Sequence, residues 1–88
     1  MVTKKEKKEV LIGRVSHFFD KIKVAVFDLE KPLKVGDRIR IEGGETNFEQ
    51  EVKSMEIDHK KVKKAKKGDP VAVLVDKKVH EGYRVYKL

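Results

Sequence analysis

Lysines are the residues of this chain whose number and spacing could do chemistry. One segment holds a histidine and six lysines within nine positions: His59, Lys60, Lys61, Lys63, Lys64, Lys66 and Lys67. A second group lies within the first eight residues, at Lys4, Lys5, Lys7 and Lys8. Clustered ammonium groups displace counterions from phosphates, so this pattern favours a polyanion such as RNA as the ligand. The alternative is a solvated tail and a solvated loop.

A second candidate for binding is the aromatic run His17, Phe18 and Phe19, close in sequence to Arg14. Neighbouring side chains on a strand point to opposite faces, so one phenylalanine is predicted to be exposed unless the strand bulges. An exposed Phe18 near Arg14 could stack on an unpaired base. The alternative is that both phenylalanines pack at one end of the core around a bulge. The predicted nucleic-acid site therefore comprises the lysine segment, His59, Arg14 and Phe18.

Catalytic and metal-binding patterns do not emerge from the sequence. The serines Ser16 and Ser54 lie in no nucleophile motif, and the three histidines are dispersed along the chain. Cysteine is absent, which excludes disulfides and thiolate metal sites. We therefore expect a protein that is not an enzyme and that has no metal, no cofactor and no small-molecule substrate. The apolar runs are too short for a signal peptide or a membrane span, which predicts a cytoplasmic protein without membrane contact.

The elements that must position these residues follow a turn that the sequence uses three times. Each copy places an apolar residue three positions before a glycine and another three positions after it, and glycine favours a tight turn into a strand. The three copies are Leu33, Gly36 and Ile39; Ala65, Gly68 and Val71; and Val79, Gly82 and Val85.

Alternating apolar residues predict six strands and no convincing helix, with at most one helical turn at 62–67. The first strand begins at Glu9, and its Gly13 marks a bulge or a close backbone approach. The second strand, at 22–29, turns Ile22, Val24, Val26 and either Phe27 or Leu29 towards the core. The strand at 47–58 bends near Ser54. Residues 1–8 are predicted to be a disordered basic tail and residues 9–88 a single all-β domain. Periodicity predicts a small closed barrel and leaves SH3-like and OB barrels as alternatives.

Four segments resemble domain II of translational GTPases such as elongation factor Tu. They are GRV at 13–15, LKVGDRIRI at 33–41, VKSMEIDHKKVKKAKKGDPVAVLV at 52–75 and KVHEGYRVYKL at 78–88. Similar barrels also occur as standalone translation elongation factor-like proteins and as an appendage on U32-type peptidases. The resemblance implies a small six-stranded closed Greek-key β-barrel. The phosphate-binding loop that GTP hydrolysis needs is absent from the chain.

These observations together predict a noncatalytic, translation-associated module that binds transfer or ribosomal RNA through the lysine segment. The resemblance also makes a translational GTPase a possible protein partner. The alternative is a protein-docking module that engages a GTPase or another enzyme in trans without binding nucleic acid. A third reading, a remnant without a dedicated ligand, is also open.

Overall fold

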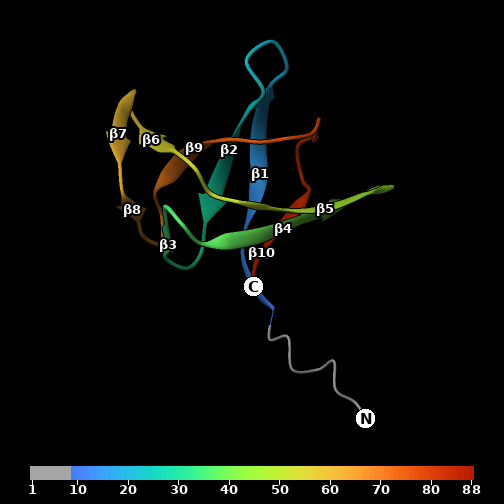
Figure 1. The fold of residues 1–88 in the computed structure, drawn as a ribbon, viewed down its shortest axis with the longest axis horizontal. Coiled ribbons are helices and arrows are strands. Elements are labelled where there is room, and N and C mark those ends of the chain that lie inside the picture. The colour runs from blue at the N-terminus through green and yellow to red at the C-terminus, as the bar shows by residue number, and fades with distance from the viewer. Residues whose placement is uncertain (1–8) are drawn as a thin grey trace.

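The computed structural model describes residues 9–88, and the fold in this range is all-β, with no helix (Figure 1). The disordered tail predicted at 1–8 lies outside the described residues. The strands are β1 (Val10–Phe19), β2 (Val24–Leu29), β3 (Leu33–Lys34), β4 (Arg38–Gly43), β5 (Thr46–Glu51), β6 (Met55–Ile57), β7 (Lys60–Val62), β8 (Lys64–Ala65), β9 (Pro70–Leu74) and β10 (Arg84–Lys87).

Eight strands form one antiparallel sheet in the order β5-β4-β10-β1-β2-β9-β6-β7, and β3 and β8 form a separate pair. The sheet curls around one core, and the β1–β2 and β4–β5 hairpins project from the body in different directions (Figure 1). Strands β5 and β7 are the two edges, so the ladder of backbone hydrogen bonds does not close. The prediction of an all-β domain is confirmed, whereas a closed six-stranded barrel is not.

The predicted three-fold turn is present at each of its positions. Gly36, Gly68 and Gly82 all adopt positive φ, between 90° and 98°, where glycine has no steric penalty. In the first two turns an aspartate carboxylate accepts a hydrogen bond from the amide three residues earlier, Asp37 from Lys34 and Asp69 from Lys66. The six apolar residues that flank the three glycines are all buried in one core. The repeated turn therefore delivers three strands to the same core.

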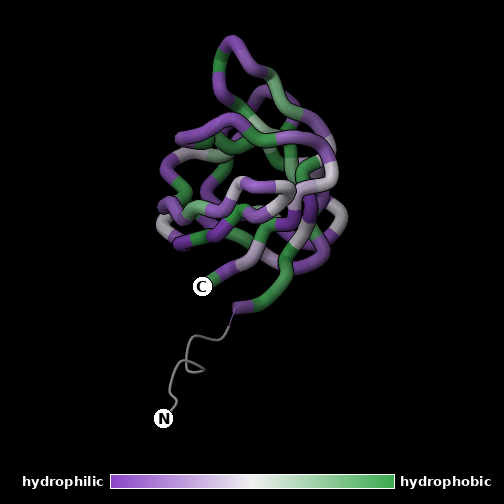
Figure 2. Tube along the Cα trace, turned by 90° about the vertical axis from the view of Figure 1, so that its right-hand side faces the viewer, coloured by the Kyte–Doolittle hydropathy of each residue, from purple (hydrophilic) through white to green (hydrophobic). Residues whose placement is uncertain are grey.

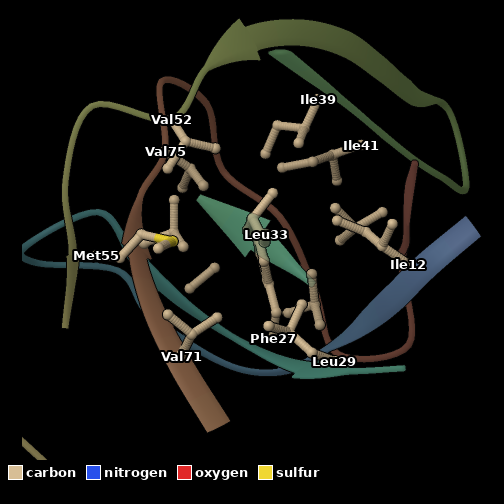
Figure 3. Close-up of a cluster of buried hydrophobic side chains, with 14 of the residues drawn as sticks. Ile12, Phe27, Leu29, Leu33, Ile39, Ile41, Val52, Met55, Val71 and Val75 are labelled. Atoms are coloured by element: carbon tan, nitrogen blue, oxygen red, sulfur yellow. The ribbon is translucent and has the colours of Figure 1, made fainter. Parts of the chain in front are cut away.

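That core is formed by the inner faces of the curled sheet and by the β3–β8 pair. Figure 3 shows Leu33 of β3 among side chains from other strands, including Ile12 of β1, Phe27 of β2 and Ile41 of β4. Each of these four side chains is at most 1% exposed. The short β3 thus fills space that the large sheet leaves open.

Strand β2 matches its predicted orientation only in part. Ile22, Val24 and Val26 were wrongly predicted to face the core. Phe27 and Leu29, one of which was predicted to face inward, are both buried, as is Ala25. Ile22 lies in the turn at 20–23, not in the strand, and its side chain is 62% exposed. The segment carries apolar residues at both parities, so periodicity alone could not choose between the two faces.

Other local predictions have mixed outcomes. Gly13 lies at a bulge, as predicted, because the β1–β10 register shifts between Leu11 and Gly13. Residues 52–54 interrupt the strand between β5 and β6, close to the bend predicted near Ser54. The helical turn considered at 62–67 was wrong, since this part of the chain contains β8. Ala65 is buried, and Val62 packs against the core.

Gln50 is the one buried polar residue of the described chain, and it joins the edge strand β5 to the end of β9. Its side-chain amide donates a hydrogen bond to the Leu74 carbonyl at 2.8 Å. Its amide oxygen accepts one from the Asp76 backbone N–H at 2.7 Å. The side chain therefore makes contacts that a neighbouring strand would make in a closed ladder.

Arg40 connects the start of β1 to the β4–β5 hairpin. Its guanidinium donates to both carboxylate oxygens of Glu9, to Asn47 Oδ1 at 3.0 Å, and lies 4.7 Å from the centre of the Tyr86 ring. The Arg40 side chain is 17% exposed. Hydrogen bonding to Glu9 raises the pKa of Arg40 above its ordinary value, so the guanidinium is charged throughout the accessible pH range.

We expect Arg40→Lys to lower the free energy of unfolding by about 1 kcal/mol, because lysine cannot reproduce the forked hydrogen bonds to Glu9 and Asn47. Urea unfolding of the variant measures this loss. The matched control is Arg38→Lys, whose guanidinium makes one exposed contact with Glu49 at 3.5 Å. The control should change stability by less than about 0.5 kcal/mol. If both variants lost the same free energy of unfolding, the forked hydrogen bonds of Arg40 would not be what stabilises the fold.

Candidate functional site

An apolar groove of about 450 Å³ lies on the outer face of β2, β9 and β6, beside the tip of the β1–β2 hairpin. Its apolar lining consists of Phe19, Ile22, Val24, Ala72 and Leu74. Ser54, Glu56 and His59 complete it. We call these eight residues the apolar groove.

The apolar groove collects much of the exposed hydrophobic surface of the described chain. Phe19 is 45% exposed, Ile22 62% and Leu74 45%, and these are three of the five large hydrophobic residues that are exposed in residues 9–88. In Figure 2, green hydrophobic segments interrupt the hydrophilic hairpin that projects at the top of the molecule. Exposed apolar side chains that gather in one place indicate an interaction site more strongly than isolated ones do.

A second groove, which we call the lysine groove, adjoins the first. It is lined by Lys53, Lys61 and Lys63 together with Val35, Met55 and Val62. Ser54 lines both grooves, whereas Glu56 of the apolar groove and Met55 of the lysine groove are consecutive residues of β6 and point to opposite faces of the strand. Val35 is another of the exposed large hydrophobics, at 38%. Basic and apolar surface are therefore next to each other here.

The six lysines of the predicted site are all exposed, but they do not form one loop. Lys60 and Lys61 lie in β7 and Lys64 in β8. Lys61 and Lys63 line the lysine groove, whereas Lys64 and Lys66 line a separate hollow beside Leu33. Within residues 9–88, none of the six forms an ion pair with a carboxylate. His59, at φ 65° in the β6–β7 turn, belongs to the apolar groove instead.

The aromatic run divides between the core and the surface in a way that the sequence left open. The β1–β2 register shifts between Val15 and His17, which is the bulge considered as one possibility. Phe18 packs against the core, and Phe19 is the exposed aromatic residue, with its ring 4.8 Å from that of His17. Arg14 is exposed on β1. Phe19 is therefore the exposed phenylalanine of this run, and Phe18, predicted to be exposed beside Arg14, is partly buried.

Groups capable of acid–base or nucleophilic chemistry do occur in the apolar groove. Ser54, Glu56 and His59 all line it, yet no hydrogen bond joins any two of them in the described chain. Ser16, the other serine, donates its hydroxyl hydrogen bond to the Val26 carbonyl. Residues 9–88 hold no group of three His, Cys, Asp or Glu side chains placed to bind a metal ion.

Comparison with known proteins gives a consistent set of relatives, although no family model matches the chain. An uncharacterised protease of Methanocaldococcus jannaschii is 48% identical over 82 residues, which are 92% of this chain and 20% of the protease. The C-terminal domain of a Geobacillus thermoleovorans protein described as a U32 peptidase superposes with a TM-score of 0.81 at 15% identity, covering 100% of this chain and 98% of that one. Its selenomethionine variant gives a TM-score of 0.78 at 14% identity, over 85% and 95% of the two chains.

The chain thus matches a segment of a protease in sequence, and it has the fold of the C-terminal domain of the Geobacillus protein. The chain spans about a fifth of the curated protease that it matches, and the solved structures establish the fold alone. Assignment to domain II of elongation factor Tu and its kind was wrong, because the relatives are peptidases. A translation-associated function, with RNA or a translational GTPase as partner, is overturned by the same finding. The comparisons do not test the individual lysines, His59 or Arg14.

One further finding concerns membranes. The described part of the chain has no helix of the length and hydrophobicity that a membrane crossing requires. A cytoplasmic location stays a prediction from the sequence.

Proposed function

We propose that this chain is a noncatalytic, peptidase-associated domain that docks on the catalytic part of a U32-type peptidase through the apolar groove. The observation that carries the proposal is that three exposed apolar side chains, Phe19, Ile22 and Leu74, gather on a chain that matches a protease segment over nearly all its length. Burial of large apolar and aromatic side chains supplies most of the binding energy at protein interfaces.

The hairpin tip favours a protein partner over a small molecule. Two of the exposed apolar side chains of the groove, Phe19 and Ile22, lie at or beside the turn of a hairpin that extends from the body (Figure 1). Apolar side chains at the end of a projecting hairpin suit the anchor residues of a protein interface.

Absence of catalysis is part of the same proposal. Within the described residues, Ser54, Glu56 and His59 of the apolar groove form no hydrogen bonds with one another. A nucleophile needs a base within hydrogen-bonding distance. His17, outside the groove, lies 3.4 Å from Glu81 on the exposed surface.

We also propose that residues 9–88 form one folding unit that acts as a closed six-stranded Greek-key barrel. One contact that supports closure is the Val35 N–H, which donates to the Lys63 carbonyl at 2.9 Å and joins the segment between β3 and β4 to the segment between β7 and β8. Gln50 adds its side-chain bridge from β5 to the end of β9. A closed barrel would hold the two grooves in a fixed relation.

The test mixes the full 88-residue chain with the Methanocaldococcus jannaschii protease from which the homologous 82-residue segment has been deleted. Analytical ultracentrifugation should show a complex with a dissociation constant in the micromolar range. The double variant Ile22→Lys, Leu74→Lys should weaken it about a hundredfold, since buried anchors each contribute more than about 1 kcal/mol. The control is Val10→Lys, which places one lysine at an exposed apolar residue outside the groove.

Circular dichroism first establishes that the shortened protease is folded. If that folded protein shows no association with the wild-type chain at about 100 µM, the proposed function is wrong. If Val10→Lys weakens the complex as much as the double variant does, the interface lies outside the apolar groove.

A further inference from the structure

We propose that the outer face of the β3–β8 pair binds an acidic segment of a partner polypeptide. The register of this pair places Lys34 directly opposite Lys64 and Leu33 directly opposite Ala65. Leu33 and Ala65 are buried in the core, so the alternation of side chains along a strand turns both lysines outward. Two ammonium groups therefore extend from neighbouring positions on one small face.

A hollow of about 430 Å³ lies against this face, and we call it the β3–β8 hollow. It is lined by Pro32, Leu33, Lys64, Ala65, Lys66 and Asp69. Three of these residues are apolar, and both of its lysines are exposed. None of the six residues lines the apolar groove, so the two surfaces can be tested separately.

The carboxylates that follow these lysines in the sequence are engaged in turns. The Asp37 carboxylate accepts a hydrogen bond from the Lys34 N–H at 3.0 Å and lies 3.4 Å from Lys87 Nζ. The Asp69 carboxylate accepts one from the Lys66 N–H, also at 3.0 Å. Both carboxylates thus hold the backbone of a glycine turn.

The ammonium groups of Lys34, Lys64 and Lys66 form no ion pair with any carboxylate of residues 9–88. Like charges directly opposite each other on a strand pair destabilise it, and this is the arrangement of Lys34 and Lys64. Carboxylates brought by a partner would relieve that repulsion and would be attracted by the lysines themselves.

The arginines contrast with these lysines. Three of the four arginines in residues 9–88, Arg38, Arg40 and Arg84, form ion pairs with glutamates, and they lie on β4 and β10. Strands β3, β7 and β8, which carry exposed lysines, lie together along the left side of Figure 1. Charge that the fold leaves unpaired on one face is available to a partner of opposite charge.

A polypeptide matches the β3–β8 hollow better than a single-stranded nucleic acid does. Proteins hold unpaired bases largely by stacking them on aromatic side chains. None of the residues that line the hollow is aromatic, and its apolar residues are Pro32, Leu33 and Ala65. An aliphatic side chain of a polypeptide can contact these residues while neighbouring carboxylates reach Lys64 and Lys66. The partner is therefore an acidic segment that includes an aliphatic residue.

The experiment titrates two peptides into the full, ¹⁵N-labelled chain and follows the amide signals by NMR. One peptide has glutamates on both sides of a leucine, and the other has glutamines in place of the glutamates. The acidic peptide should move the signals of residues 33–35 and 64–69. It should bind at least about ten times more tightly than the glutamine peptide, and its affinity should fall as salt is raised.

The variant Lys64→Glu separates lost binding from lost folding. It places opposite charges across the β3–β8 pair, so the midpoint of thermal unfolding should not fall below that of the wild type. The acidic peptide should nevertheless bind this variant at least about ten times more weakly. The matched control Lys78→Glu makes the same charge change at an exposed residue outside the hollow, and it should alter the affinity less than about twofold.

Any of four outcomes would overturn the inference. They are the absence of binding by the acidic peptide at millimolar concentration, equal binding of the two peptides, an equal loss of affinity in Lys64→Glu and Lys78→Glu, and tighter binding of a single-stranded RNA oligonucleotide than of the acidic peptide at physiological salt. None of these measurements involves the protease or the apolar groove, so this site can fail while docking on the peptidase holds, and the reverse is equally visible.

Discussion

Replacing Gly13 by alanine is expected to lower the free energy of unfolding by about 3 kcal/mol, or to prevent folding altogether. A Cβ at this position would lie 2.3 Å from the Asp28 carbonyl oxygen and 3.3 Å from the Leu29 Cα. Both atoms are backbone of the paired strand β2, so no side chain can move aside. Relief of the collision requires β1 and β2 to separate.

Urea unfolding of the variant measures the loss, and Gly36→Ala is the matched control. Gly36 has φ +98°, and no heavy atom lies within 4 Å of a Cβ built there. The control therefore introduces backbone strain without a collision, at a cost of about 1–2 kcal/mol. Equal destabilisation in the two variants would mean that the close approach of β1 and β2 is not what requires glycine at position 13.

Replacing Gln50 by methionine should cost about 2 kcal/mol, although the two side chains have nearly the same shape. The substitution leaves the Leu74 carbonyl and the Asp76 N–H without the partners that Gln50 supplies. An unsatisfied buried polar group costs about 1–3 kcal/mol. Gln50 is 4% exposed, so water compensates poorly in the folded state.

Hydrogen exchange separates this mechanism from a general loss of packing. The Asp76 amide should lose protection by about the same free energy as the global change, because its acceptor is gone. Glu51→Met, an adjacent and exposed position on β5, should change stability by less than about 0.5 kcal/mol. Retained protection at Asp76 in Gln50→Met would contradict the proposed bridge. Leu74 also belongs to the apolar groove, so the variant should disturb that surface as well.

Local turn chemistry made much of the fold predictable. The glycine turns at Gly36, Gly68 and Gly82 were predicted correctly because their signal lies within seven residues, and the structure repeats it three times. The β9 strand begins at Pro70, as expected for a residue without an N–H. The choice of the inward face of β2 failed because both parities are apolar, and only the position of the turn at 20–23 decides between them.

The candidate site was harder to predict for the same reason. Ile22 and Val24 were assigned to the core, and their apolar character therefore hid the groove that they form. The nine-residue basic segment suggested a single polyanion surface, but β7 and β8 distribute its lysines over different hollows. The family resemblance rested on motifs that serve turns and strand starts. Such motifs are shared by barrels with unrelated functions, so they indicated the fold class and misled on the function.

The two ends of the described chain give the molecule a direction. Glu9 is fixed to β4 through Arg40, and the Leu88 N–H donates to the Arg38 carbonyl on the same strand. The hairpin tip with Ile22 lies at the opposite pole (Figure 1). The residues that begin and end the described chain are therefore held together on β4, at the far end of the domain from the apolar groove.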